Sequence, residues 1–95
     1  MSDEELVALL RVRIASVVAY RMSPEWGNNR SVVTSAPVRV SLRGTERVGR
    51  DNNELQLLLN RIVDTCYTVD GFVVVGAEPG DMGQGAILVT FADTR

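Results

Sequence analysis

The sequence contains no histidine and no lysine, and all ten of its basic residues are arginine. The missing histidine excludes histidine-based acid–base catalysis and histidine metal sites. The missing lysine excludes Schiff-base chemistry and a phosphate-binding loop that carries a lysine. The exclusive use of arginine is explained either by a GC-rich genome or by selection for bidentate contacts with carboxylates or phosphates, which lysine does not make.

Cysteine and long hydrophobic runs are also scarce. The one cysteine, Cys66, cannot form a disulfide within the chain, which indicates a reducing compartment or a protein that is indifferent to redox conditions. The longest apolar run, Phe72 to Val75 with the following Gly-Ala, is far below the roughly 18 residues of a membrane span. The start of the chain, Ser2-Asp3-Glu4-Glu5, is acidic, whereas a signal peptide begins with basic residues. We therefore expect a cytoplasmic protein with no membrane partner.

The chain has 95 residues, of which 45% are hydrophobic, and a formal net charge of −2. This length predicts one compact domain over residues 1–95. A core of that size stabilises a monomer only marginally, so association with another chain, which buries further apolar surface, is favoured.

Hydrophobic periodicity predicts two helices. Apolar residues recur every three or four positions from about Asp3 to Tyr20, after Ser2 or Asp3 as the cap. The second helix is expected over 52–67, with Asp51 as its cap. Its buried stripe should comprise Leu55, Leu58, Leu59, Ile62, Val63 and Cys66.

Three segments have the pattern of strands. Residues 38–43 alternate between apolar and polar side chains, as in a strand with one buried face. Residues 32–35 are interpreted as the first half of the same strand. Pro37 places this strand at a sheet edge or at a kink. Phe72 to Val75 is apolar on both faces, as in a central strand covered by helices, and 86–91 forms the last strand. A type II turn is expected at Glu78-Pro79-Gly80-Asp81.

The order α-β-α-β-β predicts an α+β fold. We expect the two helices to pack on one face of a small, three- to four-stranded, mainly antiparallel sheet. The remaining segments are interpreted as loops: 22–31, which contains a short turn at Ser23-Pro24-Glu25 and the single tryptophan Trp26, 44–49, and a hairpin tip at 76–85.

Charge is segregated along the chain. Residues 30–50 carry five arginines and one glutamate, a net of +4, whereas residues 51–95 carry seven acids and two arginines, a net of −5. Such segregation is explained by surface charges that are solvated and pair within the chain, by contact between the basic part of one copy and the acidic part of another, or by binding to nucleic acid. The residues that we consider partner-binding candidates are Arg39, Arg43, Arg47, Arg50, Trp26, and Asp81 and Met82 in the hairpin tip.

No catalytic, cofactor-binding or metal-binding residues emerge from the sequence. The glycines of 76–85 precede a strand rather than a helix, and acidic residues among them would repel phosphate. The carboxylates have no spacing that brings two of them together, and Cys66 has no histidine to activate it. These features argue against an enzyme.

The order of a leading amphipathic helix, a strand, a second helix and a closing hairpin is similar to that of small neck and tail-terminator proteins of tailed phages, with one or two strands fewer. This resemblance implies a structural component. The sequence thus favours a non-catalytic assembly or interaction protein, homo-oligomeric or part of a larger complex. Two alternatives remain: a nucleic-acid-binding module that uses the arginine-rich strand face, and a domain or minor enzyme that binds a small anionic ligand around the turn at 43–54.

Overall fold

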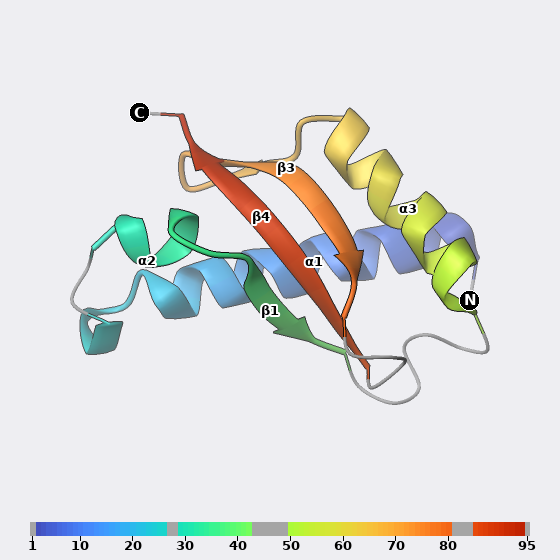
Figure 1. Cartoon of the computed structure of the whole chain (residues 1–95), viewed down its shortest axis with the longest axis horizontal. Coiled ribbons are helices and arrows are strands. Elements are labelled where there is room, and N and C mark those ends of the chain that lie inside the picture. Colours follow the sequence, from blue (N-terminus) through green and yellow to red (C-terminus); the bar gives the residue numbers. More distant parts are fainter. Residues whose placement is uncertain (1, 27–28, 43–49, 81–84, 95) are drawn as a thin grey trace.

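The computed structural model of the chain describes residues 2–26, 29–42, 50–80 and 85–94 (Figure 1). These form two long helices, two helical turns and a four-stranded antiparallel sheet, which confirms the predicted α+β class. In chain order the elements are α1 (Asp3–Arg21), η1 (Pro24–Trp26), α2 (Ser31–Thr34), β1 (Val38–Ser41), α3 (Asn52–Asp64), β2 (Thr68–Val69), β3 (Phe72–Pro79) and β4 (Ala86–Asp93). The connection predicted at 44–49 lies outside the described residues.

Helix α1 begins with a capping box. The Ser2 hydroxyl accepts a hydrogen bond from the Glu5 amide at 3.1 Å, and the Glu5 carboxylate accepts one from the Ser2 amide at 3.2 Å. This exchange pairs two amides that the first helical turn would otherwise leave without a partner. Leu6, Leu10 and Ile14 of its apolar stripe are fully buried, and the helix covers the predicted residues 3–20, so this prediction is confirmed.

Helix α3 begins where predicted, because the Asp51 carboxylate accepts a hydrogen bond from the Glu54 amide at 2.8 Å. It ends three residues earlier than predicted. The amide of Cys66 donates to the carbonyl of Val63 at 3.0 Å, and the amide of Tyr67 donates to that of Ile62 at 3.3 Å. This pair of hydrogen bonds is the Schellman motif, in which the residue just after the C-cap adopts the left-handed conformation. Cys66 is that residue, with a φ of 52°. The prediction that Cys66 is buried on the helix stripe is therefore wrong: it is exposed beyond the helix end.

The strands lie in the order β1-β4-β3-β2, and all neighbours are antiparallel. Strand β1 is an edge strand, as Pro37 predicted, and only its alternate residues Val38 and Val40 are buried. The short strand β2 was not predicted. It joins β3 through Asp70 and Gly71, both with positive φ, as the two-residue hairpin turn requires.

The predicted type II turn at residues 78–81 is wrong. Glu78 and Pro79 belong to β3, opposite Leu88 and Ile87 of β4, and Gly80 does not have the positive φ that this turn needs. The Gly80 amide donates to the Ala86 carbonyl at 2.8 Å. The nitrogen of the preceding Pro79 therefore points away from β4, and the proline removes no hydrogen bond of this ladder.

Residues 32–35 are also not the first half of a strand. They lie within and just after the helical turn α2, which follows a local turn closed by the Asn29 side chain. Its Oδ1 atom accepts hydrogen bonds from the Ser31 amide at 3.0 Å and from the Ser31 hydroxyl at 2.9 Å. Val33 is fully buried in this conformation, so packing and the side-chain turn override the β preference of two adjacent valines.

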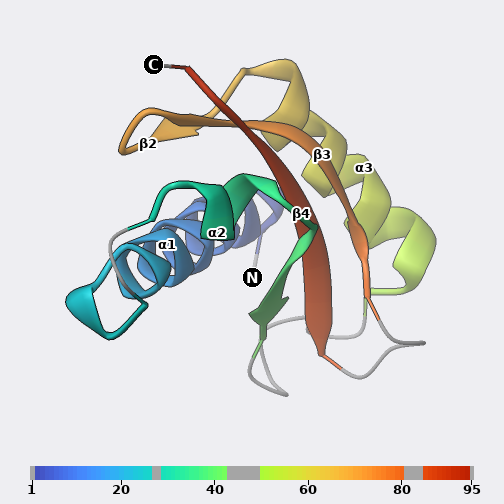
Figure 2. The ribbon, with the colours of Figure 1, turned by 60° about the vertical axis from the view of Figure 1, so that its left-hand side comes forward.

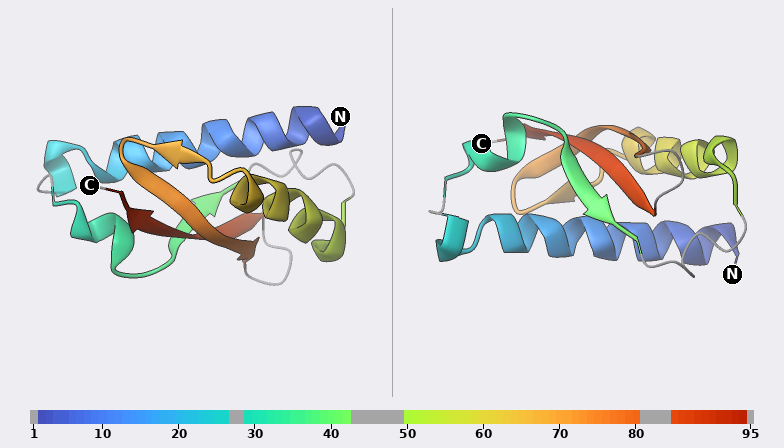
Figure 3. Two further views of the ribbon diagram at one scale, coloured as in Figure 1. Left: turned by 90° about the horizontal axis from the view of Figure 1, so that it is seen from above. Right: turned by 60° about the horizontal axis from the view of Figure 1, so that its bottom comes forward.

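The sheet curls, and the long helices occupy different positions beside it (Figure 2, Figure 3). Helix α1 lies across one face, which we call the inner face, whereas α3 runs alongside β3 at the level of the sheet. The side chain of Gln56 on α3 donates to the Ala77 carbonyl of β3 at 2.8 Å, which pairs part of that strand edge. Both helices direct their buried residues into a single core with the inner face.

The face of the sheet opposite α1 is the outer face. Register assigns to it the partly or largely exposed residues Arg39, Ser41, Thr68, Val73, Gly76, Glu78, Leu88, Thr90 and Ala92. Ala86, opposite Ser41, also belongs to this face but is fully buried. The prediction that Phe72 to Val75 is covered on both faces is therefore wrong. Phe72 and Val74 are buried, but Val75, at a bulge opposite β4, is 51% exposed.

Candidate interaction surface

Two of the four predicted arginines, Arg39 and Arg50, lie within the described residues, and their surroundings differ. Arg39 lies exposed on the outer face of β1 beside Ser41, as the alternation predicted. Arg50 instead pairs with Asp3, Nη2 to Oδ1 at 2.6 Å, and joins the start of α3 to the start of α1. Its side chain is only 13% exposed, so Arg50 holds two helices together within the chain. Arg43 and Arg47 lie outside the described residues.

Asp3 is the centre of a small ion-pair network between the two long helices. The guanidinium of Arg61 lies 3.9 Å from Asp3 and 3.8 Å from Glu4. The hydrogen bond from Arg50 lowers the pKa of the Asp3 carboxyl below its ordinary value, although partial desolvation opposes this shift. Acidic residues in the first turn of α1 thus stabilise that helix end and orient α3.

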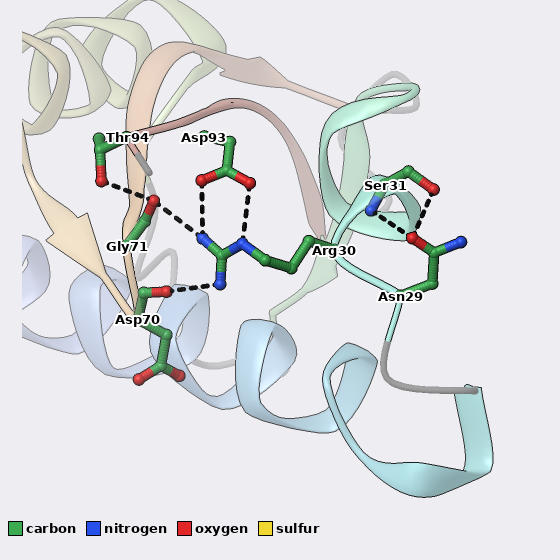
Figure 4. A network of polar contacts seen from close by, with 7 residues as sticks. All are labelled: Asn29, Arg30, Ser31, Asp70, Gly71, Asp93 and Thr94. Carbon is green, nitrogen blue, oxygen red and sulfur yellow. Dashed lines mark hydrogen bonds and ion pairs between the residues drawn. The ribbon is translucent and has the colours of Figure 1, made fainter.

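Arg30 makes four side-chain hydrogen bonds to Asp70, Gly71 and Asp93, although the sequence does not mark it as a site residue (Figure 4). Its Nε and Nη2 atoms form a bidentate pair with the Asp93 carboxylate at 2.8 and 2.9 Å. The guanidinium also donates to the carbonyls of Asp70 and Gly71 at 3.0 and 3.1 Å and lies 3.9 Å from the centre of the Phe72 ring. The hydrogen bond with Asp93 raises the pKa of Arg30 above its ordinary value.

These contacts assign Arg30 a structural role. It fastens the start of α2 to the end of β4 and to the turn between β2 and β3. Thr94 adds to the same junction, since its amide and its hydroxyl both donate to the Gly71 carbonyl at 2.8 Å. The only sequence signal for this cluster is the Asp70-Gly71 turn pair, which gives no indication that an arginine forty residues earlier reaches it.

Most of the outer face of the sheet lies outside the hydrophobic core. Three of its apolar members, Val73, Leu88 and Ala92, are partly exposed. Two charged residues lie on either side of Leu88 in one row across the sheet. Arg39 on β1 and Glu78 on β3 are both register partners of Leu88 on β4. Sequence reasoning found Arg39 but not Glu78, because it placed Glu78 in a turn.

The other candidates remain predictions. Trp26 ends the short helical turn η1, which confirms a turn after Ser23 but gives no role for the tryptophan. Asp81 and Met82 lie outside the described residues. The described segments contain no group of three histidine, cysteine, aspartate or glutamate residues that is able to hold a metal ion, and no pocket.

No described helix is both long enough and apolar enough to cross a membrane. The chain was also compared with known proteins. No protein-family model, no curated protein and no solved structure matches it.

Proposed function

We propose that this chain is a non-catalytic assembly protein that works as a homo-oligomer and uses the outer face of its sheet as the contact surface. The observation that carries the proposal is the exposure of apolar side chains across that face. Val73, Leu88 and Ala92 of β3 and β4 are only partly covered, and Val73 and Ala92 are register partners on these strands. Contiguous exposed apolar surface marks sites of contact with other molecules.

The size of the chain supports the same proposal. One sheet face and two helix stripes supply most of the described core, together with Val33 of α2 and Leu42, so a second layer on the outer face adds apolar burial that the monomer lacks. Antiparallel sheets tolerate water on one face, but that face is then mostly polar. Here the central strands β3 and β4 also place Val73, Leu88 and Ala92 there among polar residues, and a protein layer would remove these three side chains from water.

The charges on this face fit nucleic acid less well than a second protein chain. Arg39 and Ser41 project from it, as a backbone-binding strand would require. Glu78 lies in the same row as Arg39, however, and the whole chain carries a net charge of −2. A phosphate backbone laid across the sheet would meet that carboxylate.

The experiment is light scattering after size exclusion, at concentrations from about 10 μM to about 1 mM. We expect a mass that rises from 10.4 kDa toward at least twice that value as the concentration increases. A mass of 10.4 kDa at every concentration and at low salt contradicts self-assembly. Micromolar binding of duplex DNA in about 150 mM salt, lost in Arg39→Ala, would replace it with the nucleic-acid function.

A further inference from the structure

One row of side chains across the outer face has a positive charge at one end and a negative charge at the other. Arg39, Leu88 and Glu78 lie side by side on β1, β4 and β3, because Leu88 is the register partner of both charged residues. Neighbouring strands are about 4.8 Å apart, so the row places a positive and a negative side chain about 10 Å apart with a leucine between them. The positive charge comes from the basic segment 30–50 and the negative one from the acidic segment 51–95.

Two copies that pack through this face and are related by a two-fold axis have two simple arrangements. An axis across the strands sets Arg39 against Arg39 of the second copy, and Glu78 against Glu78. An axis parallel to β4 keeps each row in register and exchanges its ends, so that Arg39 of each copy faces Glu78 of the other. Like charges that face each other at an interface oppose association, so only the axis parallel to β4 suits this row.

We infer that the self-association proposed above is an isologous dimer with its two-fold axis parallel to β4, in which Arg39 of each copy pairs with Glu78 of the other. This inference rests on the proposed function and adds its geometry. A symmetric interface requires a surface that is complementary to itself, and this row meets that requirement. Leu88 then faces Leu88 of the second copy, and Thr90 faces Thr90.

The spacing of packed sheets agrees with this geometry. Face-to-face sheets lie about 10 Å apart, a gap that an arginine and a glutamate side chain span together. Gly76, opposite Thr90, adds no side chain to one neighbouring row, so it does not hold the two sheets further apart. The edge of β1 is a poorer contact, because Pro37 precedes it and Arg39 lies on it, and both features protect a sheet edge from pairing.

The area of the outer face limits the affinity of the dimer. Three strands of up to eight residues cover roughly 400 Å² in projection, about half of what one partner contributes to a stable interface of standard size. The dimer is therefore weak, with a dissociation constant in the micromolar range or above. Two charge pairs at its borders then have a measurable influence on association.

Charge reversal tests the pairing. Arg39→Glu and Glu78→Arg each set like charges opposite each other at both ends of the row, and each should raise the dimer dissociation constant by about tenfold or more. Both side chains are exposed, so circular dichroism should show that the variants fold. The double variant restores opposite charges and the original net charge, and should recover the affinity.

A mixture of the two single variants gives the sharpest result. In the mixed dimer the glutamate introduced at position 39 of one copy meets the arginine introduced at position 78 of the other, and at the opposite end of the row the native Glu78 meets the native Arg39. A mass near twice 10.4 kDa should therefore return on mixing, at concentrations where each variant alone is monomeric.

A control and two contrary outcomes complete this test. Asp64→Arg on α3 changes the net charge as Glu78→Arg does, and it should not rescue Arg39→Glu. If the wild-type chain dimerises but mixing has no effect, this geometry is wrong and self-assembly stands. If the wild-type chain never dimerises, the proposed function itself fails.

Discussion

Replacing Leu59 with alanine is expected to lower the free energy of unfolding by about 2–5 kcal/mol. Leu59 is fully buried on α3, where its stripe meets both α1 and the inner face of the sheet. The loss combines the transfer free energy of the removed methyl and methylene groups with the cavity that they leave. For a domain of this size, such a loss removes a large part of the total stability.

Leu57 on the same helix supplies the matched control, because its side chain is 66% exposed. Leu57→Ala makes the same chemical change in the same helix, yet it should alter the free energy of unfolding by no more than about 0.5 kcal/mol. Urea unfolding followed by circular dichroism measures both variants. Equal costs at the two positions would mean that the stripe does not face the core.

Phe72→Ala is expected to cost about 3–5 kcal/mol, the range for deleting a buried phenylalanine. The ring of Phe72 is fully buried. It packs edge-to-face on Phe91, with 6.3 Å between the ring centroids, and the guanidinium of Arg30 lies over it at 3.9 Å. The substitution therefore removes core volume, an aromatic pair and a cation–π contact together.

A double-mutant cycle separates the last contribution. Arg30→Ala should destabilise the wild-type chain more than it destabilises Phe72→Ala, because the contact with the ring is already missing in the second case. Arg61→Ala is the control, since the contacts of Arg61 are with Asp3 and Glu4, and its effect should be independent of Phe72. An Arg30 effect that is equally independent of Phe72 would show that the ring contact contributes nothing.

The sequence predicts the long elements because each one has a complete local signal. Ser2 and Asp51 begin the two helices, and a regular apolar spacing defines the buried side of each. The alternation of Val38 and Val40 with polar residues likewise sets the inner and outer faces of β1. Such patterns depend on nearby residues alone, so no knowledge of the tertiary structure is needed.

The errors occur where tertiary contacts decide the conformation. The apolar spacing of α3 continues to Cys66, but the helix closes before it and directs the chain toward β2. Val32 and Val33 have β-branched side chains, yet the Asn29 turn and the burial of Val33 make that segment helical. Pro79 has the sequence context of a turn residue, but it lies in β3 opposite Ile87 of β4. Its nitrogen points away from β4, so the missing amide hydrogen removes no hydrogen bond between the two strands.

The sequence predicts part of the candidate surface. Exposure of Arg39 followed from alternation, whereas the neighbourhood of Arg39, Leu88 and Glu78 depends on which strands are adjacent and in what register. Strand order is a non-local property, and β4 inserts between β1 and β3 although it is the last strand of the chain. The ion pair between Arg50 and Asp3 joins residues 47 positions apart, so no local pattern in the sequence predicts it.

The central claim is that the outer face is where two copies meet, and an NMR dilution series tests it without any substitution. Amide spectra recorded from about 1 mM down to about 10 μM should show concentration-dependent shifts at Arg39, Leu88 and Thr90. The exposed apolar residues of α1, Val12 and Tyr20, should show none. Shifts confined to α1, or spectra that do not change with concentration, would contradict the account.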